Sequence, residues 1–409
     1  MNKLFKICLT LGLLLPLCSC ESEEKNTIGF HYYYNDATMT CAVGVRSGFN
    51  LEHGEIGEYW DREENGNIVG HYKITSIYIS DDNKDYFLNN NKFIKTFVIN
   101  NSSIETLPYD IFRNSSLKEI DLSGATALKK IGDHVFENSA LESIKLPPSL
   151  EQTFKGVFSA SKIESITFPS TYQKMDIDTF FNCPNLKEVN LGENIKEISG
   201  SCFEKTPLLT KVVAPSISNI SSHAFRETPS LKDISLDNVT SIGDYAFYHS
   251  GIENVSLNNC TLGSHVFRES KVKSASLNNV PSLPYKTFGD CTNLTALSLK
   301  GNIYEIGPSA FKNTDLSKVI LPNSITFIGS EAFYHNKNLS DVTLSSSLES
   351  ISTDAFRGCN KLENIIFPSS LKRIRDGAFL ETSLKEVSLS KDVELLGSCF
   401  ESNCKVNRT

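Results

Sequence analysis

A phenylalanine returns along most of the chain at a nearly constant interval, and apolar positions keep a fixed pattern around it. Neighbouring landmarks lie 20 to 24 residues apart, which is the signature of a repeat architecture. Such a period indicates one short structural unit copied many times rather than a set of different domains. The fourteen landmarks are Phe112, Phe136, Phe158, Phe180, Phe203, Phe225, Phe247, Phe267, Phe288, Phe311, Phe333, Phe356, Phe379 and Phe400.

A second pattern follows each landmark through Phe379 after a short polar link: apolar-x-x-apolar-x-apolar, as in Leu117–Leu122 and Leu384–Leu389. An earlier copy lies at Ile94–Ile99. The fourth and sixth positions share one face of a short strand, and the third and fifth share the other. A further apolar pair, such as Ile325 and Ile328, precedes each Phe. One repeat cannot bury all these groups, but stacked repeats can. The pattern predicts a solenoid of about fourteen coils with a parallel β-sheet on one face.

The third residue after every landmark is a small polar residue or a cysteine. We expect this column to satisfy backbone donors and acceptors at a tight corner of each coil. The column comprises Ser115, Ser139, Ser161, Cys183, Thr206, Thr228, Ser250, Ser270, Cys291, Thr314, Asn336, Cys359, Thr382 and Asn403.

The positions of the cysteines within the repeat favour small buried side chains over disulfides. Three of them lie in the column described above, while Cys202 and Cys399 occupy the slot before the Phe, where other repeats have alanine. A disulfide between Cys399 and Cys404 remains an open alternative in an exported protein.

Residues 31–90 do not repeat. Tyr32–Tyr34, Cys41–Val45 and Tyr72–Ile79 have the composition of short strands. The open end of a solenoid needs a different unit to cover it, so we predict a β-rich N-terminal cap at 31–90 and the solenoid at 91–409. The last repeat ends after Phe400, which predicts a thin cover at the C-terminal end.

The first residues have the layout of a secretory signal peptide: Lys3 and Lys6, then an apolar run too short to span a bilayer comfortably. The following Leu17-Cys18-Ser19-Cys20 resembles the lipobox of bacterial lipoproteins. That resemblance implies cleavage of residues 1–19 and lipidation of Cys20, with residues 20–30 as a tether. An ordinary signal peptide that leaves Cys20 as a free thiol is the alternative.

The acidic residues Glu21, Glu23 and Glu24 resemble the export signals of surface lipoproteins in the Bacteroides group. The resemblance implies an outer-membrane protein whose body faces outward, whereas the simpler interpretation is a solvated tether. The chain has 40 basic and 48 acidic residues, and loss of Lys3 and Lys6 changes the net charge from −8 to about −10. Since there is also no basic run, we expect no nucleic-acid partner, and membrane contact through the lipid alone.

The string Ile-Gly-x-x-Ala-Phe, present at Ile242–Phe247, Ile306–Phe311 and Ile328–Phe333, resembles the BspA-like leucine-rich repeats of bacterial surface proteins. The resemblance covers about 91–409 and implies a leucine-rich repeat fold. Two repeats depart from it: the one ending at Phe267 lacks the Ile-Gly pair, and Leu283-Pro284 replaces it before Phe288. We expect irregular coils there.

No candidate active site emerges from the sequence. His134, His223 and His265 occupy the slot two before the Phe but never in adjacent repeats, so we interpret them as surface or half-buried residues. His249 and His335 recur in Phe-Tyr-His units four coils apart. No hydrolase, metalloprotease or phosphate-loop motif is present. We therefore predict no catalytic residues, no metal, no cofactor and no enzymatic activity.

The outward side of the predicted sheet is the candidate binding face. It is polar and rich in serine, and it lacks the aromatic anchors that usually carry interface energy. It is either a plain solvated surface or the site of a broad, weak, multivalent contact. Tyr32–Tyr34 and Trp60 in the cap are a rival contact site. The candidate residues on the face are Glu119, Glu188, Lys211, Asp233, Asn254, Lys318, Asp341, Asn364 and Glu386.

The resemblance to BspA-like proteins implies a surface recognition or adhesion lipoprotein that binds an extracellular protein or glycoprotein. Two alternatives stay open. A glycan-capture lipoprotein would present aromatic platforms with nearby carboxylates. A periplasm-facing envelope scaffold would follow if the acidic segment after Cys20 were inert.

Overall fold

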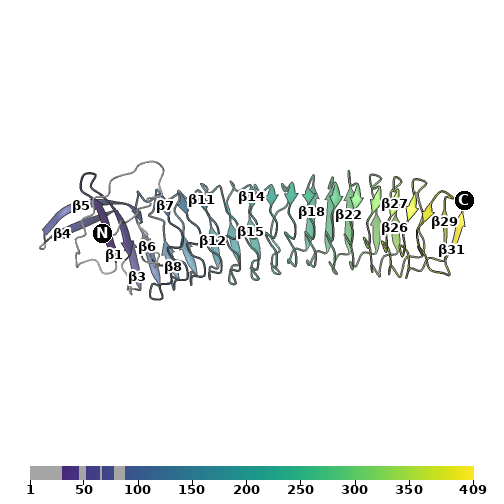
Figure 1. Cartoon of the computed structure of the whole chain (residues 1–409), viewed down its shortest axis with the longest axis horizontal. Coiled ribbons are helices and arrows are strands. Elements are labelled where there is room, and N and C mark those ends of the chain that lie inside the picture. The colour runs from purple at the N-terminus through teal and green to yellow at the C-terminus, as the bar shows by residue number, and fades with distance from the viewer. Residues whose placement is uncertain (1–29, 46–51, 65–66, 78–87) are drawn as a thin grey trace, which may run out of the picture.

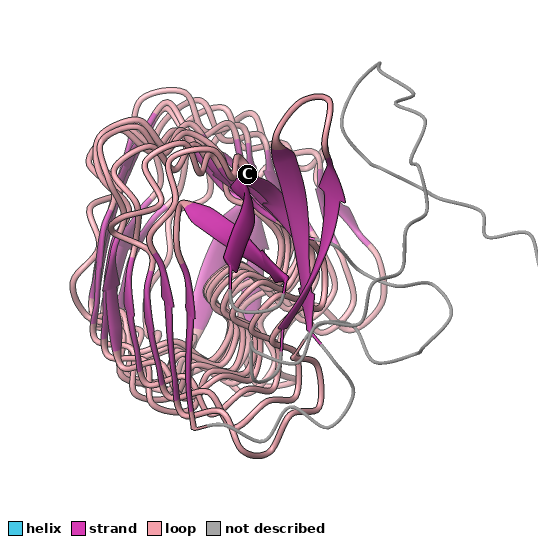
Figure 2. Ribbon diagram, turned by 90° about the vertical axis from the view of Figure 1, so that its left-hand side faces the viewer, coloured by secondary structure: helices cyan, strands magenta, loops and turns pink. Residues whose placement is uncertain are grey.

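The computed structural model describes residues 30–45, 52–64, 67–77 and 88–409. The predicted signal peptide, Cys20 and nearly all of the predicted tether lie outside these residues. The described chain forms a long, straight rod of about fourteen stacked coils with a small sheet at its N-terminal end (Figure 1). Viewed along the rod, successive coils overlie one another (Figure 2). The predicted repeat solenoid is confirmed.

One side of the rod carries a row of parallel strands whose outward side is called the sheet face below. Residues of successive coils are in register, for example Glu188 opposite Lys211 in neighbouring strands. The strands of this row are β3 (His53–Ile56), β6 (Thr96–Ile99), β8 (Glu119–Asp121), β10 (Ser143–Lys145), β12 (Ser165–Thr167), β13 (Glu188–Asn190), β15 (Lys211–Val213), β18 (Asn254–Asn258), β20 (Ser274–Asn278), β22 (Ala296–Lys300), β24 (Lys318–Ile320), β26 (Asp341–Thr343), β29 (Glu386–Leu389) and β31 (Lys405–Arg408). The row is divided into short sheets, because the coils at Asp233 and Asn364 lack a strand and because the successive strands β10 and β12, and β22 and β24, are not paired.

A second row of two-residue strands precedes the landmark phenylalanines. Two of these strands lie in the coils for which the sequence predicted irregularity. There Leu262 and Leu283 take the place of the usual isoleucine, and each pairs in register with one neighbouring coil. These two strands are not paired with each other, so the row is interrupted between the two coils while the coils themselves keep the architecture. The row comprises β7 (Thr106–Leu107), β9 (Lys130–Ile131), β11 (Gln152–Thr153), β14 (Glu197–Ile198), β16 (Asn219–Ile220), β17 (Ser241–Ile242), β19 (Thr261–Leu262), β21 (Ser282–Leu283), β23 (Glu305–Ile306), β25 (Phe327–Ile328), β27 (Ser350–Ile351), β28 (Arg373–Ile374) and β30 (Glu394–Leu395).

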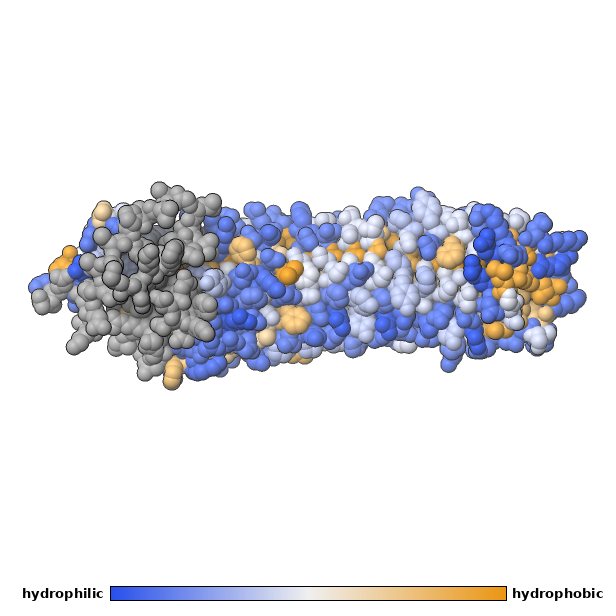
Figure 3. All heavy atoms as spheres, in the orientation of Figure 1, coloured by the Kyte–Doolittle hydropathy of each residue, from blue (hydrophilic) through white to orange (hydrophobic). Residues whose placement is uncertain are grey.

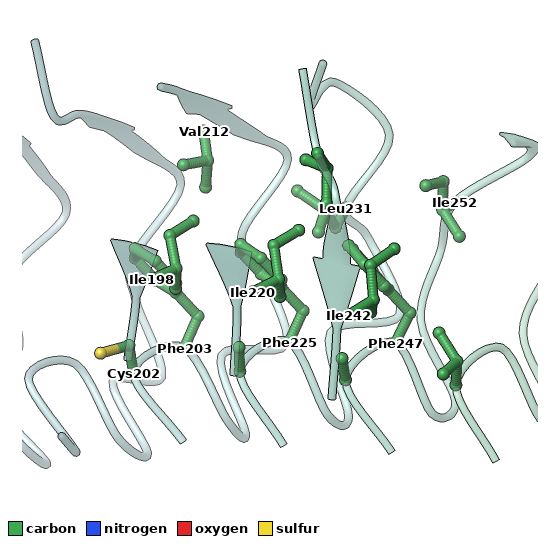
Figure 4. Close-up of a cluster of buried hydrophobic side chains, with 14 of the residues drawn as sticks. Ile198, Cys202, Phe203, Val212, Ile220, Phe225, Leu231, Ile242, Phe247 and Ile252 are labelled. Atoms are coloured by element: carbon green, nitrogen blue, oxygen red, sulfur yellow. The ribbon is translucent and has the colours of Figure 1, made fainter. Parts of the chain in front are cut away.

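The landmark phenylalanines form a continuous stack through the core. Neighbouring rings from Phe112 to Phe400 have centroids 5.0–5.6 Å apart and planes within 3–15°. All but Phe400 are fully buried. Isoleucines of the two-residue strands pack beside the rings, as Figure 4 shows for Ile220 with Phe225. Each coil therefore shares its core only with the coils on either side.

In most coils the column three residues after the Phe serves the corner, as predicted, whereas the buried Ser250 hydroxyl makes no hydrogen bond within the described part of the chain. The hydroxyl groups of Thr206 and Thr228 donate to the carbonyl oxygens of Phe203 and Phe225, both at 2.7 Å. The Cys291 thiol instead donates to the carbonyl of the preceding coil's Phe267, at 2.9 Å. Small donors are required here because a larger side chain would separate the coils.

The corner also has a feature that the sequence interpretation missed. The residues two before and two after the landmark Phe have positive φ, close to +50 to +77°, in the coils from Phe112 to Phe379. This left-handed conformation is costly for residues with a Cβ, and Asn, Asp and Gly adopt it most readily. It explains the recurrence of Asn138, Asp178 and Gly358, and of the histidines.

The N-terminal cap is a four-stranded sheet in the order β1-β2-β5-β4: β1 (Phe30–Asn35), β2 (Thr40–Val45), β5 (Asn67–Ile77) and β4 (Tyr59–Glu64). Its inner side packs on the first coil, where the ring of Phe30 meets that of Phe97 at 6.4 Å. The Asn101 amide donates to the carbonyl of Ile74. Within 31–90, however, β3 pairs with β6 and so belongs to the solenoid sheet rather than to the cap.

The C-terminal end has more structure than the sequence predicted. The chain continues beyond Phe400 into β31, which pairs in parallel with β29. Arg408 replaces the usual inward apolar residue, and its guanidinium donates to the carbonyl of Val393 at 2.8 Å. The expectation that the last repeat ends after Phe400 was wrong. Within the described ranges, no helix has the length and hydropathy needed to cross a bilayer.

Candidate functional site

The structure places the predicted binding residues on the sheet face. Eight of the nine side chains are exposed, and Lys211 is half-buried. Glu119, Glu188, Asn254, Lys318 and Glu386 begin their strands. Asn364 lies in a coil without a strand. The third position of the repeat therefore forms one line along the rod, but its members do not converge on a pocket.

The charges on this line are largely neutralised between neighbouring coils. Lys211 pairs with Glu188 at 3.3 Å and Lys318 with Asp341 at 2.7 Å. At the fifth position of the repeat, which also faces outward, the Lys145 ammonium group lies 2.6 Å from Asp121. Hydrogen bonds from Lys145 and Ser123 lower the pKa of Asp121 to about 2. Exposed pairs of this kind contribute little stability, and they also leave little net charge for a ligand to recognise.

An apolar site lies near the C-terminal end of the sheet face. Ile366 is 86% exposed, in a coil where residues 362–368 form no strand. Beside it is a hollow of about 440 Å³ that is lined by apolar residues such as Ile365, Phe367 and Val387 and by nearly as many polar ones, such as Glu386, Ser388 and Ser390. Figure 3 shows a largely hydrophilic surface on which apolar groups gather toward this end of the rod. We call the hollow together with Ile366 the apolar notch.

The sequence contained a signal for the notch. The fifth position of the repeat faces outward and is most often serine, but in two coils it is an isoleucine, Ile320 and Ile366. The interpretation of the face as uniformly polar missed it, because the missing strand at 362–368 could not be seen in a repeat pattern that is otherwise intact. A second, shallower hollow of about 370 Å³ lies over β18, β20 and β22, above small residues such as Ser256 and Ser276.

The cap presents its aromatic residues on both sides of its sheet. On the inner side, the Trp60 ring stacks on Tyr32 at 4.7 Å and lies near Tyr72 at 5.5 Å, so these rings pack on one another within the cap. On the outer side, Tyr33 and Tyr59 are 41% and 53% exposed. The rival contact site expected at Tyr32–Tyr34 and Trp60 is thus divided between two opposite faces.

Comparison with known protein families decides the identity of the repeat. The BspA type leucine rich repeat region matches residues 105–232, 218–340 and 326–408. The chain belongs to the BspA-type leucine-rich repeat family. This bears out the resemblance seen in the Ile-Gly-x-x-Ala-Phe strings.

Solved structures are similar to this BspA-type chain, and one of them, from Bacteroides ovatus, shares its fold. A leucine-rich repeat protein from Bacteroides ovatus ATCC 8483 is 23% identical, covers 95% of this chain and 100% of its own, and has a TM-score of 0.72. A leucine rich cell surface protein from Faecalibacterium prausnitzii A2-165 is 16% identical, with coverage of 96% and 95% and a TM-score of 0.39. The pneumococcal vaccine antigen PcpA is 20% identical, with coverage of 95% and 98% and a TM-score of 0.44. A comparison with curated protein sequences finds no match.

The histidines of the BspA-type repeats occupy the two left-handed columns. His223, Tyr245, His265 and Tyr285 form an aromatic row over four consecutive coils, with rings 5.4, 4.3 and 4.8 Å apart. His134 and His223 are half-buried, as expected, but His265 is only 9% exposed because tyrosines cover it from both neighbouring coils. Among the described residues, no three His, Cys, Asp or Glu side chains are arranged to hold a metal ion.

The cysteines of the BspA-type repeats are small core residues, as predicted. Cys183, Cys202, Cys291 and Cys359 are fully buried, and burial raises the pKa of each thiol to about 12. Cys399 and Cys404 are both free thiols in the structure, so the alternative of a disulfide between them is not realised there. Thiols that stay protonated and buried are poor nucleophiles.

Proposed function

We propose that the chain is a non-enzymatic recognition and adhesion protein, anchored in the outer membrane through a lipid on Cys20, with its body at the cell surface. Its partner is an extracellular protein or glycoprotein that docks on the sheet face. Membership of the BspA-type family and the long ordered surface support this proposal. The described residues contain exposed polar rows and ion pairs, but no convergent group of nucleophile, base and acid.

The apolar notch carries the proposal. A large apolar side chain that is 86% exposed contributes nothing to the core, and here it lies beside a hollow lined by further apolar groups and by polar ones such as Ser388. Exposed apolar groups gathered on a polar surface are typical of protein–protein contact sites. A partner side chain that fills the hollow would be desolvated at the centre of a polar rim, which is the usual arrangement of an interface hot spot.

Binding to purified extracellular-matrix proteins and mucins, measured by surface plasmon resonance, tests the role of the notch. We expect Ile366→Asp to weaken binding at least tenfold without changing the melting temperature, because the side chain is almost wholly in solvent. Ile177→Asp is the matched control, since Ile177 is 41% exposed beside Phe180 at the corner of the coil. Equal affinities for the two variants would contradict docking at the notch.

Protease treatment of intact cells tests the location. We expect the body to be digested from intact cells and to be released from the membrane fraction in a Cys20→Ala variant. Survival of the body until the outer membrane is permeabilised would exclude adhesion and favour the periplasm-facing scaffold.

A further inference from the structure

The outer side of the cap sheet carries a group of exposed polar and aromatic side chains that the proposed function does not use. Strand alternation directs Trp60 and Tyr72 toward the inner side. Their neighbours in sequence therefore point outward. We call Tyr33, Tyr59, Asp61, His71 and Lys73 the cap platform.

One end of the platform is held in place by its own contacts. The Tyr59 ring lies on the His71 ring, with centroids 4.4 Å apart and planes at 19°. The imidazole Nδ1 of His71 is hydrogen-bonded to a carboxylate oxygen of Asp61, its cross-strand partner. All three side chains are nevertheless exposed, Tyr59 by 53%. An exposed ring that is already oriented loses little conformational entropy when a ligand stacks on it.

The other end is Tyr33, on the opposite edge strand. The row Tyr59, Lys73, Thr40 and Asn35 crosses all four strands, and Tyr33 is two residues along β1 from that row. Three strand spacings and this offset put the two tyrosines roughly 16 Å apart. The β2 residues between them, Thr40 and Ala42, are short. The result is a flat strip with an aromatic ring at each end.

The size of this surface decides between a macromolecular and a small partner. Four strands of about six paired residues cover roughly 20 by 20 Å. That is about 400 Å², half of the roughly 800 Å² that a stable protein partner needs on each side. A ligand a few sugar units long matches the strip.

The chemistry of the platform also matches a carbohydrate. A pyranose ring has an apolar C–H face that packs on an aromatic side chain, and its hydroxyl groups bond to carboxylates and ammonium groups. Within the cap platform, the Asp61 carboxylate and the Lys73 ammonium group balance each other, which favours an uncharged ligand there, while the exposed Glu63 lies two residues further along β4. We propose that the outer face of the cap binds a neutral oligosaccharide, with sugar rings stacked on Tyr59 and Tyr33 and hydroxyl groups bonded to Asp61, His71 and Lys73.

Isothermal titration calorimetry of the mature full-length chain with cellohexaose, mannohexaose and maltohexaose tests this site. We expect at least one of these probes to bind, Tyr59→Ala to weaken that binding at least tenfold, and Tyr33→Ala to weaken it less. Tyr59→Trp should retain binding because it keeps the platform. Circular dichroism should show an unchanged fold, since both tyrosines are exposed.

The controls separate this site from the sheet face. Ile366→Asp should leave oligosaccharide binding unchanged, just as Tyr59→Ala should leave binding of an extracellular protein at the notch unchanged. Absence of heat with all three hexasaccharides at millimolar concentration would overturn the proposal. So would full binding by the Tyr33→Ala/Tyr59→Ala double variant, or loss of oligosaccharide binding in Ile366→Asp.

Discussion

At the scale of single residues, some left-handed corner positions carry a residue with a Cβ where glycine would make the folded chain more stable. Ala160 has φ of +54° and donates its N–H to the Phe181 carbonyl of the next coil. The left-handed conformation costs a residue with a Cβ roughly 1–2 kcal/mol, while glycine loses roughly 0.5–1 kcal/mol in backbone entropy. We expect Ala160→Gly to raise the free energy of unfolding by roughly 0.5 kcal/mol in urea denaturation. Ala160→Val should lower it, and the opposite order would refute the argument.

His265 should make the protein sensitive to acid. Burial, followed by the nearby charges of Arg268 and Lys286, lowers its pKa from 6.5, and Asp244 opposes this only in part. The unfolded chain therefore binds the proton more readily than the folded chain. Stability is fully present above the ordinary pKa and is lost as the pH falls through it toward the folded pKa.

We expect the free energy of unfolding to fall between about pH 7 and pH 5, and to fall less steeply in His265→Gln. Urea denaturation at a series of pH values measures this slope. His223→Gln is the control because His223 lies in the same aromatic row but is only half-buried. The same slope in wild type and His265→Gln would rule out this residue as the source.

At the scale of elements, the phenylalanine stack is the main support of each coil. Phe225 is fully buried between Phe203 and Phe247, each 5.1 Å away. Truncation of a buried Phe to Ala costs about 3–5 kcal/mol through lost transfer energy and the cavity left behind. We expect Phe225→Ala to lower the free energy of unfolding by that amount and Phe225→Leu by less. Phe93→Ala should have almost no effect, since Phe93 is 55% exposed.

The repeat elements could be predicted from the sequence because each is encoded many times. The Phe stack, the outward third position and the column three residues after the Phe all follow from positions that recur from coil to coil. The left-handed columns could have been found by the same means: Asn114, Asn138, Asn182 and Asn313 recur two residues after the Phe. The histidines belong to the same pattern, since His, Asn and Asp share one backbone preference rather than one chemistry.

The elements that occur once could not be predicted in the same way. Pairing of β3 with β6 joins His53 to Thr96 across a long stretch of chain. The platform requires Tyr33, Tyr59 and His71 to lie on one face of the cap sheet, and alternation alone does not specify the strand order that places them there. Alternation indicates which side of a strand is apolar, but not which strands are neighbours. The candidate sheet face was therefore predictable, whereas the cap platform and the notch were not.

At the scale of the whole molecule, the structure behaves as a one-dimensional stack. Both strand rows and the corner advance by one hydrogen-bonded spacing per coil, so neither side of the rod is wider than the other. This accounts for the straight rod in Figure 1, because curvature in a solenoid needs a rotation between successive repeats. The cap and the notch are consequently held far apart, and a partner at one does not obstruct the other.

Such a stack should tolerate the loss of one whole coil but not of half a coil. Deletion of residues 312–333 joins Phe311 to Tyr334, so that Asn336 still stands three residues after a landmark Phe. Every neighbouring coil then meets a partner with the same pattern. We expect a cooperative β-fold by circular dichroism and a rod shorter by about 5 Å in small-angle X-ray scattering.

Deletion of residues 312–322 removes a similar kind of sequence but shifts the Phe stack out of register, and it should abolish cooperative melting. If both deletions fold equally well, the coil is not the unit of stability; if neither folds, contacts beyond nearest neighbours hold the rod together.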